Sequence, residues 1–378
     1  MSTTGTVAAA DTAAKAGKAG NANAAADTTL AQRLRQEVDQ LVQRSLKGLD
    51  YLGSPAPAIG TTPRRLLHRR GTLALYHYNA TASEVYRVPL LLVMATTNKC
   101  DIFDLAPGQS LIGYLLAQGY DVYVMDWNPP TQDERTLTIE SYTLDFIPDC
   151  IRRVQQDAGV DAVTLVGYCM GGVLATIHAA LHAGGPVKNL VCFTTPIDWK
   201  QMTLFQALSD QRHFDVDRMV DALGNVPADF IANAFSAQRP VSPVASQVRL
   251  WDNMWNDQYV KGYRMMDRWA SEMLPLAGDY FRQTVKHLLW QNGLHEGTLR
   301  IGGRVVALQN ITVPLLHVVA KHDHLVPPAC AAPLVAKVGS ADKEELMLPG
   351  GHVSLVAGPN AVKRMWPALD QWLGKRST

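Results

Sequence analysis

The sequence predicts an α/β fold in which a doubly wound, mostly parallel sheet is covered by helices on both faces. Short apolar runs, typical of buried parallel strands, alternate with helical stretches from residue 72 to residue 193. The sequence then becomes helical and rich in Met and Trp, and the strand pattern resumes only at residue 313. We expect this largely helical insertion to cap the carboxyl ends of the strands, where such folds place their sites.

The individual elements follow from local periodicity. Runs that are uniformly apolar or alternate with period two predict strands, and apolar residues at three- and four-residue spacing predict helices. The predicted strands cover 72–78, 90–94, 122–125, 163–166, 190–193, 313–320 and 345–348. The predicted helices among them cover 111–116, 144–154, 173–182 and 360–373.

The rest of the chain divides into a tail, a helix and the cap. Residues 1–29 carry few large apolar side chains, so they predict a disordered tail without a secretory signal. Leu and Val recur at helical spacing over 30–49, and a linker follows to residue 60. This helix is expected to pack either on its own domain or against another subunit. The core is expected over 61–196 and 311–378, and the cap over 197–310.

Composition excludes several classes of protein. The 378 residues have a net charge of +1, which argues against a nucleic-acid binder, and contain no apolar run long enough to span a membrane. The five cysteines form no CxxC pair, which indicates free thiols in a reducing, cytoplasmic protein. No metal-ligand spacing and no glycine-rich phosphate loop is present, so neither a metal nor a cofactor is expected.

One short motif carries the chemistry. Gly167-Tyr168-Cys169-Met170-Gly171 follows an apolar strand and precedes a helix of small residues, which is the setting of a nucleophile elbow with Cys in place of Ser. The glycines suit the tight turn, and the helix N-terminus with the Met170 amide favours a thiolate and an oxyanion. The alternative is a buried structural cysteine in a glycine-rich turn.

An elbow requires an acid and then a histidine later in the chain. Asp323 follows the predicted strand 313–320, and His352 follows the strand that ends at residue 348. The second oxyanion donor is expected in the loop after strand 90–94, with the backbone amide of Thr97 as the candidate. His322 and His324 are expected to be exposed neighbours.

Cysteine at the elbow favours acyl transfer. A thiolate is both a strong nucleophile and a good leaving group toward thioesters, so acyl groups move on and off it readily. Cysteine therefore suits transfer from a thioester to an alcohol acceptor.

Taken together, these strings resemble the polyhydroxyalkanoate synthases, and most closely the two-subunit, short-chain-length class III type within the α/β-hydrolase superfamily. The resemblance covers residues 60–375. It rests on 98–105, 121–127, 167–172, 195–199, 214–217, 250–253, 323–328 and 350–352. The loop Ala95-Thr96-Thr97 departs from the hydrophobic residues that the family pattern would have there.

The resemblance implies polymerisation of (R)-3-hydroxyacyl-CoA, most closely 3-hydroxybutyryl-CoA, into polyester with release of CoA. Cys169 would carry the growing chain, His352 would take the thiol proton, and Asp323 would help His352 activate the 3-hydroxyl group. It also implies a small helical second subunit, association as a homodimer or larger, and a place at the surface of polyester granules.

Two other functions stay open at this point. A thioesterase or an intracellular polyester depolymerase could use the same Cys169–Asp323–His352 set, because it differs only in admitting water to the acyl intermediate. A non-catalytic granule or scaffold protein could keep the fold, but the intact set of three residues counts against it.

Overall fold

The computed structural model describes residues 30, 32–238 and 242–378, which form two compact units. One unit combines the chain up to Ala56 with Pro243–Tyr263, and the other combines Pro57–Ser242 with Arg264–Thr378. The tail predicted at 1–29 lies outside the described residues. Each unit is described by itself below.

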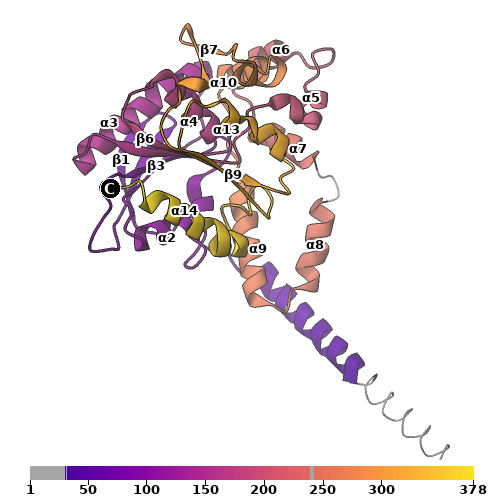
Figure 1. Cartoon of the computed structure of the whole chain (residues 1–378). Coiled ribbons are helices and arrows are strands. Elements are labelled where there is room, and N and C mark those ends of the chain that lie inside the picture. The colour runs from indigo at the N-terminus through magenta and orange to yellow at the C-terminus, as the bar shows by residue number, and fades with distance from the viewer. Residues whose placement is uncertain (1–29, 31, 239–241) are drawn as a thin grey trace, which may run out of the picture. The chain divides into compact units, whose positions relative to one another are not determined.

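Eight strands of the larger unit form one sheet within the described part of the chain (Figure 1). Their order across the sheet is β1-β2-β4-β3-β5-β6-β9-β10. The pairings β1/β2 and β2/β4 are antiparallel, and every other pairing is parallel. The strands are β1 Arg64–Arg70, β2 Leu73–Tyr78, β3 Leu90–Val93, β4 Val122–Trp127, β5 Val163–Tyr168, β6 Val187–Phe193, β9 Leu315–Ala320 and β10 Lys343–Leu348.

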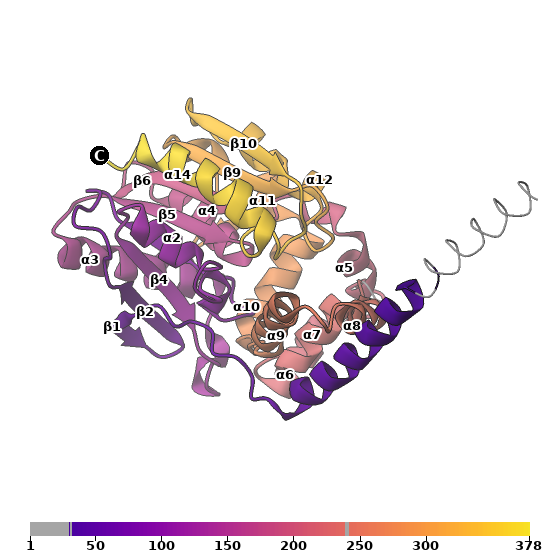
Figure 2. The ribbon, with the colours of Figure 1, turned by 90° about the horizontal axis from the view of Figure 1, so that it is seen from below.

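Helices cover both faces of this sheet. Helices α2 (Leu111–Ala117) and α14 (Trp366–Gly374) lie on one face, and α3 (Ile147–Ala158) and α4 (Met170–Leu181) lie on the other (Figures 1 and 2). All six residues of β4, β5 and β9 are buried, as expected for central strands with both faces covered. The predicted fold class, an α/β-hydrolase fold with a helical cap insertion, is confirmed.

The sequence pattern missed the first strand. β1 has the sequence RRLLHRR, whose charge hides the alternation that marks a strand. It lies at the edge of the sheet, where charged side chains are common because they discourage pairing with other chains. Its basic side chains pair with carboxylates of the helical segment 141–158: Arg65 with Asp157 at 2.5 Å, His68 with Asp149 at 3.1 Å and Arg70 with Asp145 at 2.6 Å.

The insertion between β6 and β9 is largely helical. In the larger unit it contains α5 (Thr203–Leu208), α6 (Val216–Leu223), α7 (Ala228–Ser236), α10 (Gly278–Gln283), α11 (Gly293–Glu296) and the hairpin of β7 (Arg300–Ile301) and β8 (Arg304–Val305). Helices α8 (Ser242–Asp252) and α9 (Asp257–Ser271) each lie across a boundary between the two units. Residues 264–314 of the larger unit connect α9 to β9 and form the segment by which the chain returns from the cap to the sheet.

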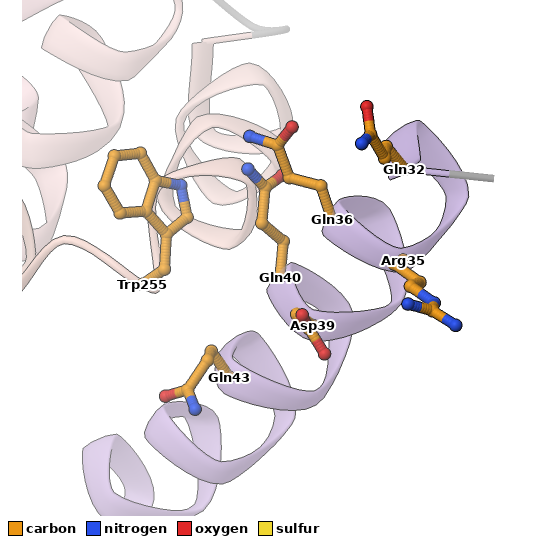
Figure 3. Close-up of a pocket in the computed structure, with 7 residues that line it drawn as sticks. All are labelled: Gln32, Arg35, Gln36, Asp39, Gln40, Gln43 and Trp255. Carbon is orange, nitrogen blue, oxygen red and sulfur yellow. The ribbon is translucent and has the colours of Figure 1, made fainter. Parts of the chain in front are cut away.

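The smaller unit pairs the N-terminal helix with residues 243–263. The helix covers 32–53, and Lys47 forms an ion pair with Asp257 at 2.5 Å. Gln36 and Gln40 project from the side of the helix that faces Trp255 (Figure 3). The apolar stripe of the helix is exposed instead, with Leu34, Val38, Leu41, Leu46 and Leu49 each more than half exposed.

Two buried histidines should make the fold sensitive to mild acid. Burial lowers the pKa of His178 to about 4 and that of His317 to about 3. Between about pH 6.5, the usual value, and pH 4 the unfolded chain therefore binds protons that the folded chain does not. The free energy of unfolding should therefore fall as the pH is lowered from about 6.5 to 4, by on the order of 3 kcal/mol for His178.

Urea unfolding at a series of pH values tests this expectation. The His178→Gln variant should show a flatter profile between pH 6.5 and 4, whereas the matched variant of the exposed His322, His322→Gln, should follow the unmodified chain. Equal unfolding free energies at pH 7 and pH 4.5 would contradict the expectation.

Candidate active site

The elbow holds Cys169 in a strained conformation between β5 and α4. Cys169 has φ 53° and ψ −119°, a region that residues with a Cβ rarely adopt. The turn is tight, because a Cβ on Gly171 would collide with the carbonyl oxygens of Val93 and Met94, and one on Gly167 would collide with Gly172. The backbone therefore projects the Cys169 side chain at the carboxyl edge of the sheet, where it is partly exposed.

His352 and Asp323 come from the loops after the two neighbouring strands β10 and β9. The Nδ1 atom of His352 lies 2.7 Å from Oδ2 of Asp323, and both side chains are buried. The other oxygen of Asp323 accepts hydrogen bonds of 2.9 Å from the amides of Leu325 and Val326. These amides fix the carboxylate, so its free oxygen points at the imidazole.

The two loops are also joined to each other and to the elbow. The Lys321 amide donates to the carbonyl of Leu348, and the His322 amide donates to the carbonyl of Gly350. The ring of Tyr168, the residue before Cys169, lies 5.3 Å from the His352 ring. Backbone hydrogen bonds therefore join the two loops, and a ring contact links His352 to the elbow.

The electrostatics of the three side chains favour a protonated imidazole. Burial alone would lower the pKa of His352, but the charges of Cys169 and Asp323, together with hydrogen bonds to both side chains, raise that pKa well above its usual value. A histidine that keeps its proton beside a thiol suits an ion pair of imidazolium and thiolate.

The two candidate oxyanion donors lie on either side of the elbow. Met170 is the first residue of α4, and first-turn amides have no acceptor within their own helix. Thr97 belongs to the loop after β3, which pairs with β5 so that Val93 lies opposite Gly167. The carbonyl of Thr97 accepts a hydrogen bond of 2.8 Å from the Leu274 amide of the cap. Both positions are at the carboxyl edge of the sheet.

The remaining histidine and cysteine candidates are not part of the three-residue set. His322 and His324 are exposed, as expected. Cys100, Cys150, Cys192 and Cys330 are free and buried. Among the described residues, no three His, Cys, Asp or Glu side chains gather closely enough to hold a metal ion. No helix in that part of the chain is long and apolar enough to cross a membrane.

Two contacts near the site were not predicted from the sequence. The carboxylate of Asp126, at the end of β4, is fully buried, pairs with Lys99 and accepts the Cys100 amide at 2.9 Å. The hydroxyls of Thr96 and Tyr280 are hydrogen-bonded at 3.1 Å. The partners are far apart in sequence, so no spacing rule links them, although Asn98-Lys99 and Asp126 both fall within the strings that carry the resemblance.

Sequence identity to two poly(3-hydroxyalkanoate) polymerase subunits decides the family of this chain. The chain is 34% identical over 348 residues to the poly(3-hydroxyalkanoate) polymerase subunit PhaC of Allochromatium vinosum, which covers 91% of this chain and 98% of that protein. The protein of the same name from Synechocystis is 30% identical over 361 residues, covering 93% and 95%. The chain belongs to the poly(3-hydroxyalkanoate) polymerase family. This confirms the resemblance to the polyhydroxyalkanoate synthases, a family of acyltransferases.

Two family models match along the chain of this polymerase family member. The model of the poly-beta-hydroxybutyrate polymerase (PhaC) N-terminus matches residues 27–115, and the alpha/beta hydrolase fold matches residues 100–359. A monoglyceride lipase variant from Saccharomyces cerevisiae has a TM-score of 0.51 at 15% identity, covering 86% of this chain and 99% of that one. Epoxide hydrolase A from Mycobacterium thermoresistibile also has a TM-score of 0.51 at 15% identity, covering 83% and 98%. These two likenesses concern the fold alone.

Proposed function

We propose that this polymerase uses Cys169, His352 and Asp323 to polymerise (R)-3-hydroxyacyl-CoA, with 3-hydroxybutyryl-CoA as the substrate. The observation that carries the proposal is the convergence of the three residues at one edge of the sheet, with Nδ1 of His352 2.7 Å from Asp323 and Cys169 at the neighbouring elbow, where its charge helps raise the pKa of His352. Family membership supports polyester synthesis as the outcome of that chemistry.

Acylation begins with the thiolate of Cys169. Its sulfur attacks the thioester carbonyl carbon, and the carbonyl oxygen becomes an oxyanion that the amides of Met170 and Thr97 stabilise. When the intermediate collapses, the carbon–sulfur bond to CoA breaks, and the departing CoA thiolate takes the proton from the His352 imidazolium. The product is an acyl-Cys169 and neutral His352.

Elongation then requires a base for an alcohol. Neutral His352, oriented through Nδ1 by Asp323, takes the proton of a 3-hydroxyl group, and the resulting oxygen nucleophile attacks the acyl thioester. An ester bond forms, and the thioester bond to the enzyme breaks. Buried surroundings favour this transfer over hydrolysis, since His352 and Asp323 are both largely shielded from water.

The N-terminal helix suits the second subunit that the class III resemblance implies. Its apolar side chains are more than half exposed at Leu34, Val38 and Leu41, while its polar side faces Trp255. A helical partner would bury this stripe at helical spacing. We also propose a dimer or larger assembly of the catalytic subunit at the surface of a polyester granule.

A product assay tests the proposed reaction. Purified protein given 3-hydroxybutyryl-CoA should release CoA and form water-insoluble material, and a small helical second subunit should increase both. The same assay with a medium-chain hydroxyacyl-CoA should give little product. CoA release accompanied only by soluble free acid would favour a thioesterase and overturn the proposal.

A further inference from the structure

The return segment of the cap is hydrogen-bonded to the loop that follows β3. The Leu274 amide donates to the Thr97 carbonyl at 2.8 Å, and Asn98 and Met273 form an isolated antiparallel bridge. The indole Nε1 of Trp269 donates to the Lys99 carbonyl at 2.8 Å.

A fourth contact joins two buried hydroxyls. The hydroxyl of Thr96 donates to the hydroxyl of Tyr280 at 3.1 Å, and both residues are less than 5% exposed. The four successive residues of this loop, 96–99, are thus each contacted by the cap segment 269–280.

The other side of the same loop is fixed to the sheet. Asp126 of β4 pairs with Lys99 and accepts the Cys100 amide, and the indole of Trp127 donates to the Met94 carbonyl at 2.9 Å. Residues 94 and 99–100 are therefore anchored to the core. Residues 96–98, between these anchors, each contact the cap through a hydrogen bond or a backbone bridge.

The end of β3 and the first residue of this loop pack against the elbow. Val93 pairs with Gly167, and the carbonyl oxygens of Val93 and Met94 are packed against Gly171 so closely that a Cβ there would collide. A donor to the oxyanion from this loop acts only if its N–H lies within about 3 Å of the developing charge. A shift of a few tenths of an ångström in residues 95–97 would therefore be felt in the acylation rate.

The cap segment 269–280 also forms backbone contacts with the connection between α6 and α7. Val226 and Leu276 exchange backbone hydrogen bonds of 2.8 and 3.0 Å, and Gly278 is packed against the Gly224 carbonyl. The segment therefore lies between the α6–α7 connection and the loop after β3. A displacement of the cap would be transmitted to the loop through backbone contacts.

We propose that Tyr280 and Trp269 are positioning residues of the acylation step: through Thr96 and Lys99 they set the backbone of loop 95–99, so the second oxyanion donor is in place only while the cap segment is bound to it. This inference rests on the proposed acyl-Cys169 mechanism. Neither side chain reacts; each acts through the loop.

Two reactions of Cys169 separate this role from a general structural one. Acylation by 3-hydroxybutyryl-CoA develops an oxyanion, whereas alkylation by iodoacetamide does not. Both are measured on the full-length chain, acylation as the first-turnover burst of CoA and alkylation by mass spectrometry of the Cys169 peptide. Tyr280→Phe, Thr96→Val and Trp269→Phe should each slow acylation at least tenfold and leave alkylation within twofold.

The Thr96→Val/Tyr280→Phe double variant should be no slower than either single variant, because the two hydroxyls form one contact. Tyr142→Phe is the matched control. Its ring lies 4.6 Å from that of Tyr280, but it makes none of the four contacts between the cap segment and loop 96–99, so both rates should stay within twofold.

Unchanged acylation in all three single variants would overturn the inference, and so would a parallel loss of acylation and alkylation. Failure of the proposed function would look different. In that case, alkylation of Cys169 in the unmodified protein would leave CoA release intact.

Discussion

Replacing Cys169 by alanine should reduce CoA release from 3-hydroxybutyryl-CoA by at least about 10⁴-fold, the scale seen when a catalytic nucleophile is removed. No other described cysteine can take over, since Cys100, Cys150, Cys192 and Cys330 are all buried. Burial raises the pKa of the Cys330 thiol to about 12 and that of Cys192 to about 11, so both stay protonated at neutral pH. Steady-state CoA release, followed by a thiol reagent, measures the effect.

The fold should survive this change. Cys169 is partly exposed, so the loss of one sulfur atom leaves only a small cavity, and alanine meets the same strain at φ 53° as cysteine does. Cys330→Ala is the matched control: it removes a fully buried thiol near the site and should cost stability while keeping turnover. Turnover by Cys169→Ala above a hundredth of the unmodified rate would show that the elbow cysteine is not the nucleophile.

Local periodicity was sufficient to predict most of the fold. β3, β5 and β9 are uniformly apolar because both of their faces are covered, so each strand could be recognised from a few residues. β1 could not, because its stabilising contacts are with carboxylates 75 to 92 positions away, such as Asp145 and Asp157. Helix existence was also easier to predict than helix type: a π-helical turn over Ser141–Phe146 precedes α3.

In the candidate site, too, some residues could be predicted from local patterns and others could not. Cys169, Asp323 and His352 each follow a recognisable strand, and parallel strands bring their carboxyl ends to one edge, so their proximity could be expected from order alone. The cap contacts could not be expected, because Thr96 and Tyr280 are 184 positions apart and neither belongs to a motif. The direction in which the cap packs depends on tertiary contacts, and local sequence periodicity does not predict these.

The N-terminal helix shows how one pattern allows two outcomes. Its apolar spacing predicted a helix, and a helix is present over 32–53. Two surfaces were expected for its apolar stripe, its own domain or another subunit; the helix contacts residues 243–263 through Lys47 and Asp257, while Leu34 and Leu49 are more than half exposed. Amphipathicity identifies the face that will be buried, but not the surface that buries it.

Asp323→Asn should uncouple the two halves of the reaction, keeping acylation of Cys169 while slowing elongation by about 10²- to 10⁴-fold. The asparagine oxygen can still accept the Leu325 and Val326 amides, so the loop is retained. Its NH₂ group then faces Nδ1 of His352, which favours the tautomer with the proton on Nε2. That tautomer cannot remove a proton from a 3-hydroxyl group, and the negative charge that helps raise the pKa of His352 is also lost.

Acylation is less sensitive because a thiol is a far stronger acid than an alcohol, so forming the nucleophile depends less on a positioned base for the thiol than for the 3-hydroxyl group. Rapid mixing should therefore show a CoA burst of one equivalent per Cys169 followed by a very slow steady phase. Raising the pH should restore the burst rate but not the steady rate. His324→Gln, a change at an exposed neighbour in the same loop, is the control and should alter neither phase. An equal loss of burst and steady rates would mean that Asp323 serves only to orient His352 for both steps.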